Sequence, residues 1–189
     1  MASVPRLPQF SPAELDADQR QVYDAIAGGR RASGQQAFAL TEPDGRLRGP
    51  FNAMLLSPPV GGALQAVGSA VRYESTLDAR TRELAILAVA THWDSAFEWA
   101  AHEAVGRQAG LTDDDFAAVR IGEPPPSATE TERVALRTAT ALLTDRGLDA
   151  DVYTAAVEAL GERGLFELTT LVGYYATLAL QLRVFAGEG

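Results

Sequence analysis

The chain has 189 residues, of which 47% are hydrophobic and 22% charged; this is ordinary globular composition and is enough for one domain with a sizeable core. Its formal net charge is -9. An acidic surface repels nucleic-acid phosphates and anionic lipids, so neither nucleic acid nor a membrane is an expected partner. The chain contains no cysteine, which excludes thiol and disulfide chemistry.

The longest apolar run, residues 84–90, is far shorter than the roughly 20 residues that span a bilayer. The first ten residues lack the apolar stretch of a secretory signal peptide. We therefore expect a cytoplasmic protein, and the lack of cysteine agrees with that compartment.

The N-terminal quarter of the chain predicts one helix and a long loop. Ser11-Pro12-Ala13-Glu14 has the pattern of a capping box, and it predicts a helix that runs through Ile26 and stops at Gly28-Gly29. Residues 30–50 show no helical periodicity and contain the turn sequence Glu42-Pro43-Asp44-Gly45. We expect a single domain over residues 1–189, with an N-terminal extension and loop over about residues 1–50.

Beyond Pro50 the pattern is helical to the C-terminus. After a short apolar turn at 51–56, the expected helices cover residues 60–73, 79–91, 94 or 95 to 110, 112–119, 127–144 (from a capping box at Ser127–Glu130), 149–160 and 165–185. Asp78 and the pair Thr112 and Asp115 are expected helix caps. Strand patterns are scarce, so the predicted fold class is all-α with about eight helices.

Candidate catalytic residues gather around one of the two histidines. Ser95, Glu98 and His102 are spaced i, i+3, i+7, which places them on one helical face. Antiparallel packing of the preceding helix would bring Glu83 towards Glu98 and His102. An imidazole gives and takes protons near neutral pH, and a neighbouring carboxylate fixes its tautomer. The predicted site is therefore suited to acid–base chemistry.

The same residues also allow purely structural interpretations. Glu98 and His102 are also compatible with an ordinary surface pair at i,i+4 spacing. Glu83 lies near a helix N-terminus, where it would complement the helix dipole or pair with Arg80 or Arg82.

The aromatic residues carry the same ambiguity. Trp93, Trp99 and Tyr174, together with Ser95, are candidates for the wall of a substrate pocket. Tryptophan, however, is most often a core residue, and Tyr174 has a packing interpretation as well. His92 is expected in a solvated turn.

No metal or cofactor is expected. Di-iron bundles use Glu-x-x-His at i,i+3 twice, whereas Glu98 and His102 are spaced i,i+4 and no second copy carries a histidine. The sequence also lacks a P-loop, a dinucleotide-binding glycine pattern and a nucleophile elbow.

Three segments of the chain are similar to the carboxymuconolactone decarboxylase family, which includes the alkylhydroperoxidase D-like proteins. They are Arg82-Glu-Leu-Ala-Ile-Leu87, Phe97-Glu-Trp-Ala-Ala-His-Glu103 and Gly110-Leu-Thr112. The flanking segments Gly49–Met54 and Leu171–Tyr175 resemble longer members, so that the similarity covers about residues 45–186.

The resemblance implies an all-α, alkylhydroperoxidase D-like helical bundle, a homo-oligomer (trimer or hexamer), and an active site around Glu83 and His102. The peroxidase branch of the family carries a Cys-x-x-Cys pair, and the matching positions here are Ser95 and Glu98. Because neither side chain can form a disulfide or act as a peroxidatic thiolate, thiol-based reduction is excluded.

We therefore expect a cofactor-free, decarboxylase-like lyase whose small carboxylated or carbonyl (lactone-type) substrate lies between helices. His102 is the expected proton donor, Glu98 its partner and Glu83 the second carboxylate. The alternative is a non-catalytic oligomeric binding or scaffold protein that keeps the fold. A sealed, apolar site with Glu98 turned outward to an arginine would favour that alternative.

Overall fold

The computed structural model describes residues 6–32 and 37–186, and within them the chain folds into eight α-helices. They are α1 (Ala17–Ala27), α2 (Pro50–Met54), α3 (Pro58–Tyr73), α4 (Ala79–His92), α5 (Ala96–Gln108), α6 (Asp113–Arg120), α7 (Glu130–Thr144) and α8 (Ala150–Gln181). Short 3-10 turns at Pro12–Glu14 and Arg30–Ala32 and a π turn at Leu182–Ala186 complete the list. The predicted all-α fold is confirmed.

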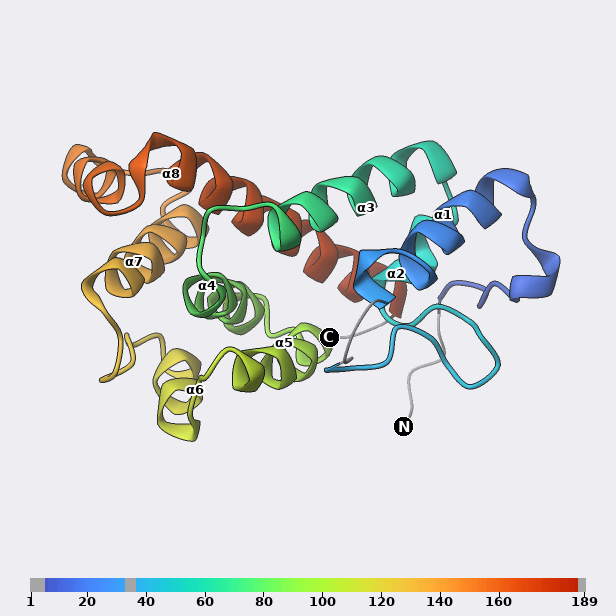
Figure 1. The fold of residues 1–189 in the computed structure, drawn as a ribbon, viewed down its shortest axis with the longest axis horizontal. Helices are drawn as coiled ribbons and strands as arrows, with labels where there is room; N and C mark the ends of the chain where they lie inside the picture. Colours follow the sequence, from blue (N-terminus) through green and yellow to red (C-terminus); the bar gives the residue numbers. More distant parts are fainter. Residues whose placement is uncertain (1–5, 33–36, 187–189) are drawn as a thin grey trace.

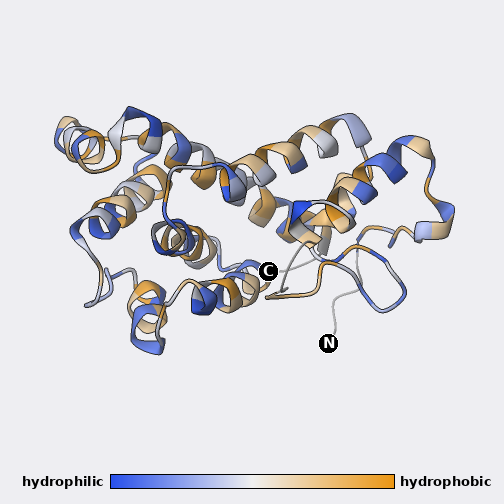
Figure 2. Ribbon diagram, in the orientation of Figure 1, coloured by the Kyte–Doolittle hydropathy of each residue, from blue (hydrophilic) through white to orange (hydrophobic). Residues whose placement is uncertain are grey.

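Helix α4 is the centre of the molecule. It packs against α5, α7 and α8, and Figure 1 shows it surrounded by other helices. Seven of its residues from Glu83 to Ala90 are buried (all but Ala88), as the continuous apolar run predicts. Hydrophobic residues recur along every helix (Figure 2), and the main core gathers those of α1, α2, α3, α4, α7 and α8. No helix in the described ranges is long and apolar enough to span a bilayer.

Several helix starts lie where the sequence predicts them. The Asp78 side chain accepts a hydrogen bond from the Thr81 amide at the start of α4. Thr112 and Asp115 form a reciprocal capping box at the start of α6. Of the two candidates for α5, Ser95 is the cap, while Asp94 has a left-handed backbone with φ of 50°.

The N-terminal capping box is a correction. Ser11–Glu14 forms only a 3-10 turn, and the Ser11 side chain makes no capping bond. The extended backbone of Leu15 ends this turn, and α1 starts afresh with Asp16 and Gln19 as its capping box.

The second correction lies at the start of α7. Its capping box is formed by Thr129 and Glu132, not by Ser127 and Glu130. The Ser127 hydroxyl instead donates to the Asp115 carboxylate, which holds the preceding loop against α6.

The two helices predicted at the C-terminus are present as the two segments of α8. They meet at Gly161, whose φ of 71° and ψ of 165° are not helical. Figure 1 shows α8 changing direction near its start. Glycine carries no Cβ, so it adopts a positive φ at little cost. The chain can therefore change direction between the two helical segments without a longer loop.

The predicted loop before Pro50 is ordered over its described part. The Glu42 amide donates to the Arg46 carbonyl and the Arg48 amide to the Leu40 carbonyl, which together with a bridge between Thr41 and Leu47 makes a tight hairpin. This confirms the turn at residues 42–45. The hairpin delivers the chain to Gly49 and α2, next to α5.

Candidate active site

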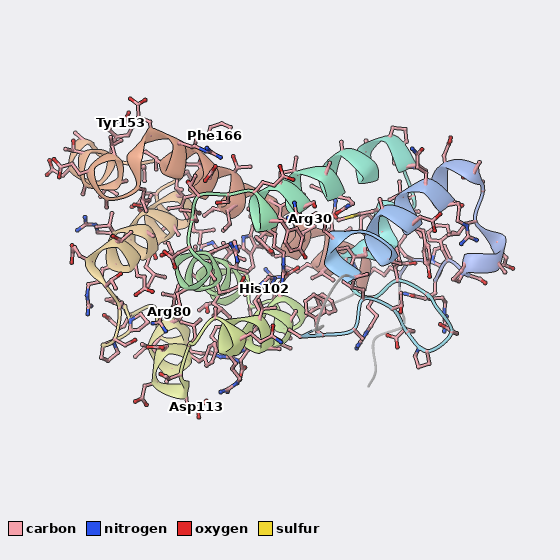
Figure 3. The ribbon with its side chains drawn as sticks, viewed as in Figure 1. Arg30, Arg80, His102, Asp113, Tyr153 and Phe166 are labelled. Atoms are coloured by element: carbon pink, nitrogen blue, oxygen red, sulfur yellow. The ribbon has the colours of Figure 1, made fainter. Side chains whose placement is uncertain are left out.

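A buried imidazole–carboxylate pair lies where α4 meets α5. The two helices are joined by a short turn, which brings Glu83 of α4 to His102 of α5. Their side chains are 0% and 3% exposed, and His102 Nδ1 lies 2.7 Å from Glu83 Oε2. In Figure 3 His102 lies deep within the molecule, between the two helices.

A second carboxylate faces the other ring nitrogen. Glu98 Oε2 lies 3.6 Å from His102 Nε2, and the Glu98 side chain is 4% exposed. The imidazole of His102 is thus bracketed by two carboxylates. Since all three side chains are buried, they do not form an exposed surface pair.

Positive charges around Glu83 keep it ionised. Burial by itself would raise the pKa of Glu83, but the His102 imidazole and the guanidinium groups of Arg72 and Arg82 lower it below its ordinary value. Arg82 Nε lies 3.6 Å from Glu83 Oε1. Because an ionised carboxylate only accepts hydrogen bonds, Nδ1 of His102 must carry the proton that points at Glu83. Nε2 is then the nitrogen that faces Glu98 and the adjoining space.

That space is a small cavity of about 10 Å³, enough for roughly one water molecule. His102 and Glu98 border it together with Arg72 of α3, and Phe51, Phe97, Tyr174 and Tyr175 are among the aromatic residues in its wall. A larger ligand must therefore displace some of these side chains to reach His102.

Tyr175 supplies a protonated hydroxyl to the site. Its ring packs edge-on against His102, with centroids 4.9 Å apart, and against Tyr174 at 5.1 Å. Burial raises the pKa of Tyr175 far above its ordinary value, with Glu83 adding to the effect, so its hydroxyl stays neutral. Tyr174, predicted for the pocket wall, borders the same cavity.

Three other residues predicted for the pocket wall are not among those that border this cavity. Ser95 is buried as the cap of α5, where its hydroxyl accepts from the Glu98 amide. Trp99 packs against Phe116 and donates from Nε1 to Glu103. Trp93 packs against the main core after the end of α4.

Sequence reasoning missed Arg72 and Phe51 as residues of the site. Arg72 carries one usable feature, since residues 58–71 contain no charged side chain and Arg72 is the first charge after them. A lone arginine at the end of an uncharged helix indicates a specific task. His92, by contrast, is exposed at the end of α4, as predicted.

The residue types at the site do not gather as metal ligands. The described residues contain no group of three or more histidine, aspartate or glutamate side chains placed to hold a metal ion. Instead, each ring nitrogen of His102 faces a carboxylate.

The comparisons with known proteins concern the family and the fold. Residues 58–141 match the sequence model of the Carboxymuconolactone decarboxylase family, and this region contains Arg72, Glu83, Glu98 and His102. No curated protein sequence matches the chain.

The fold is similar to the crystal structure of a protein of unknown function from Agrobacterium tumefaciens, for which a role as the antioxidant defence protein AhpD has been suggested. The TM-score is 0.65 at 20% sequence identity, and the match covers 75% of this chain and 97% of that chain. At this identity the likeness concerns the fold alone. Together these findings confirm that residues 58–141 form a carboxymuconolactone decarboxylase family region, without cysteine, inside an AhpD-like helical fold.

Proposed function

We propose that the protein is a cofactor-free acid–base enzyme of the decarboxylase-like type, acting on a small carboxylated or carbonyl compound. The observation that carries the proposal is the His102 imidazole, held between two buried carboxylates at the edge of a cavity. A protein that only needed a stable core would gain more from apolar residues here, because burying charged groups is costly.

Each residue has a defined task in the proposed reaction. When the bond to the substrate carboxyl breaks, carbon dioxide leaves and the electron pair moves into a conjugated carbonyl. His102, protonated on Nε2, then donates that proton to carbon. Glu83 orients the ring through Nδ1 and stabilises its charged form, and Glu98 exchanges the proton with His102.

The alternative function, a non-catalytic binding or scaffold protein, has one supporting observation. The cavity holds only about 10 Å³, which leaves no room for a substrate until side chains move. Its wall carries the charged or polar side chains of Arg72, Glu98 and His102, however, and Glu98 Oε2 lies 3.6 Å from His102 Nε2. These two features favour the enzyme.

The histidines provide a matched test. We expect His102→Gln to lower the rate of carboxylate loss about 10²–10⁴-fold, the usual contribution of general acid–base catalysis. His92→Gln changes an exposed histidine at the end of the neighbouring helix and should leave the rate unchanged. The measurement is carbon dioxide release from a panel of 3-oxo acids and carboxylated lactones.

Circular dichroism of both variants shows whether the fold is intact. Equal rates for His102→Gln and the parent protein would remove His102 from the mechanism. If no member of the panel is consumed, the scaffold function is the one that remains.

A further inference from the structure

Arg72 is the only arginine or lysine among the described residues that border the cavity. It lies in the last turn of α3, and the neighbouring wall is formed by Tyr175, Glu98 and His102. The cavity therefore places one permanent positive charge beside the candidate proton donor.

Neighbouring groups stabilise the positive charge of Arg72, and no ion pair in the described part of the chain neutralises it. Burial opposes that charge, but Tyr175 and Glu83 raise the pKa of Arg72 above its ordinary value. In the described part of the chain, Glu83 pairs with His102 and lies near Arg82, and no ion pair involves Arg72. Its planar fork of five donors is thus without a bidentate carboxylate partner there.

Such a fork matches a carboxylate. An arginine binds a carboxylate through two parallel hydrogen bonds, a geometry that neither lysine nor a neutral amide reproduces. Arg72 is half-buried, and its neighbours Tyr175 and Glu83 stabilise its charge without pairing with the guanidinium in this bidentate way. A carboxylate ligand would supply that pairing.

We infer that Arg72 is the specificity-determining residue of the site and binds a carboxylate of the ligand next to His102. This inference rests on the proposed function for its catalytic meaning. Strong pairing with the carboxylate that leaves would stabilise the ground state and slow the reaction. The carboxylate held by Arg72 is therefore one that stays on the product, and unreactive carboxylates should bind as inhibitors.

The test compares acids with their neutral amides. The probes are benzoate with benzamide, and 4-oxopentanoate with its amide, and binding is measured by calorimetry and thermal shift. The parent protein should bind the acids and be stabilised by them. Arg72→Gln should weaken acid binding about 10–100-fold without strengthening amide binding. Arg72→Lys, which keeps the charge but loses the fork, should fall between the two.

Arg137→Gln is the matched control. Arg137 is an exposed arginine on α7 that borders a separate surface hollow and not the cavity at His102. It should bind the probes as the parent protein does. If Arg137→Gln loses acid binding while Arg72→Gln keeps it, the carboxylates bind at the other hollow and the inference is overturned.

The remaining outcomes separate this inference from the proposed function. Loss of acid binding in Arg72→Gln, with no turnover of any acid by the parent protein, supports Arg72 and removes the enzyme. Equal binding of acids and amides by the parent protein, or no binding of either, contradicts the role of Arg72. If Arg72→Gln does not fold, an unchanged acid preference in Arg72→Lys contradicts it as well.

Discussion

Glu83 is fully buried and yet charged. Burial raises its pKa, but His102, Arg72 and Arg82 together lower it below its ordinary value. A buried charge in such a setting stabilises the fold only while its partners are present. Glu83 therefore has two effects: it stabilises the packing of α4 against α5, and it orients the His102 imidazole.

Removal of Glu83 should be costly. We expect Glu83→Ala to lower the free energy of unfolding by about 3–5 kcal/mol, because it leaves buried cationic groups without their carboxylate. Glu123→Ala, at an exposed carboxylate in the loop after α6, should change it by less than about 0.5 kcal/mol. Urea unfolding of both variants measures the difference. Equal losses would show that the pair contributes no more than a surface charge.

The sequence predicted the residues of the site that share a local pattern. Glu98 and His102 lie one helical turn apart, so spacing grouped them, whereas Glu83 lies on the preceding helix and was added from the expected antiparallel packing of the two helices. Arg72 reaches the cavity from α3, and Phe51 from α2. Both depend on tertiary packing, which no spacing within one helix reveals.

At the scale of elements, Gly49 sets how the hairpin joins the site. Its φ is 58°, and a Cβ at this position would lie 2.2 Å from Cζ of Phe97, which borders the cavity. The close approach of the backbone to this ring requires glycine. The segment before α2 is therefore fitted to α5 at the edge of the candidate site.

Two glycine substitutions compare a positive-φ position in open space with one in close contact. Gly110→Ala, at φ of 88° with no atom within 4 Å of the added Cβ, should cost only the strain of about 1–2 kcal/mol. Gly49→Ala should cost more, because its φ of 58° and ψ of -135° lie outside the left-handed helical region and overpacking against Phe97 adds about 1–3 kcal/mol. Thermal and urea unfolding give both values. If Gly49→Ala costs no more than Gly110→Ala, the contact with Phe97 is not tight.

Glu167 connects α8 to the loop between α3 and α4. Its carboxylate accepts hydrogen bonds from the Thr76 amide at 2.7 Å, the Thr76 hydroxyl at 2.6 Å and the Ser75 hydroxyl at 3.0 Å, and Arg163 lies 2.9 Å away. Burial opposes the charge, but these bonds lower the pKa of Glu167 from 4.5 to about 2.

The lowered pKa of Glu167 predicts an acid-dependent loss of stability. Since the folded state holds the proton less tightly than the unfolded state, the contribution is complete above about pH 4.5 and disappears as the pH falls towards 2. Glu167→Gln should therefore be less stable than the parent protein at neutral pH, by about 1–3 kcal/mol, and the gap should narrow below about pH 3. Glu162→Gln, on the exposed side of the same helix, is the control. A gap that is constant with pH would contradict this role of the Glu167 charge.

Prediction from sequence was good for the helices and poorer for their ends. The helical periodicity of apolar residues and the cap residues identified α3 to α7, because both depend only on residues close together in the sequence. Asp16 and Thr129 cap α1 and α7 in place of Ser11 and Ser127, because each exchanges hydrogen bonds with the residue three positions later. The hairpin before Gly49 has no sustained alternation, so only its turn could be recognised.

At the scale of the whole molecule, two neighbouring helices present surfaces without charge. Residues 58–71 of α3 and 168–182 at the end of α8 contain no acidic or basic side chain, and the two helices pack against each other. Val67 on α3 is 41% exposed, and Leu180 on α8 is 49% exposed. Phe166 on α8 is 70% exposed beside the charged Glu167, and Figure 3 shows it projecting away from the ribbon. We expect these exposed apolar side chains of α3 and α8 to belong to an interface.

The family resemblance implies a homo-oligomer. We expect other copies of the chain to bury this surface in it. Light scattering should therefore give a mass that is a multiple of the 20.1 kDa chain. Val67→Glu and Phe166→Glu should each shift the mass towards one chain, because burying an unpaired carboxylate in an apolar interface is costly. Ile121→Glu is the matched control, since Ile121 is 76% exposed but follows α6, away from α3 and α8. If the parent protein is a monomer at micromolar concentration, the oligomer prediction is wrong. If only Ile121→Glu dissociates it, the interface lies at the other end of the molecule.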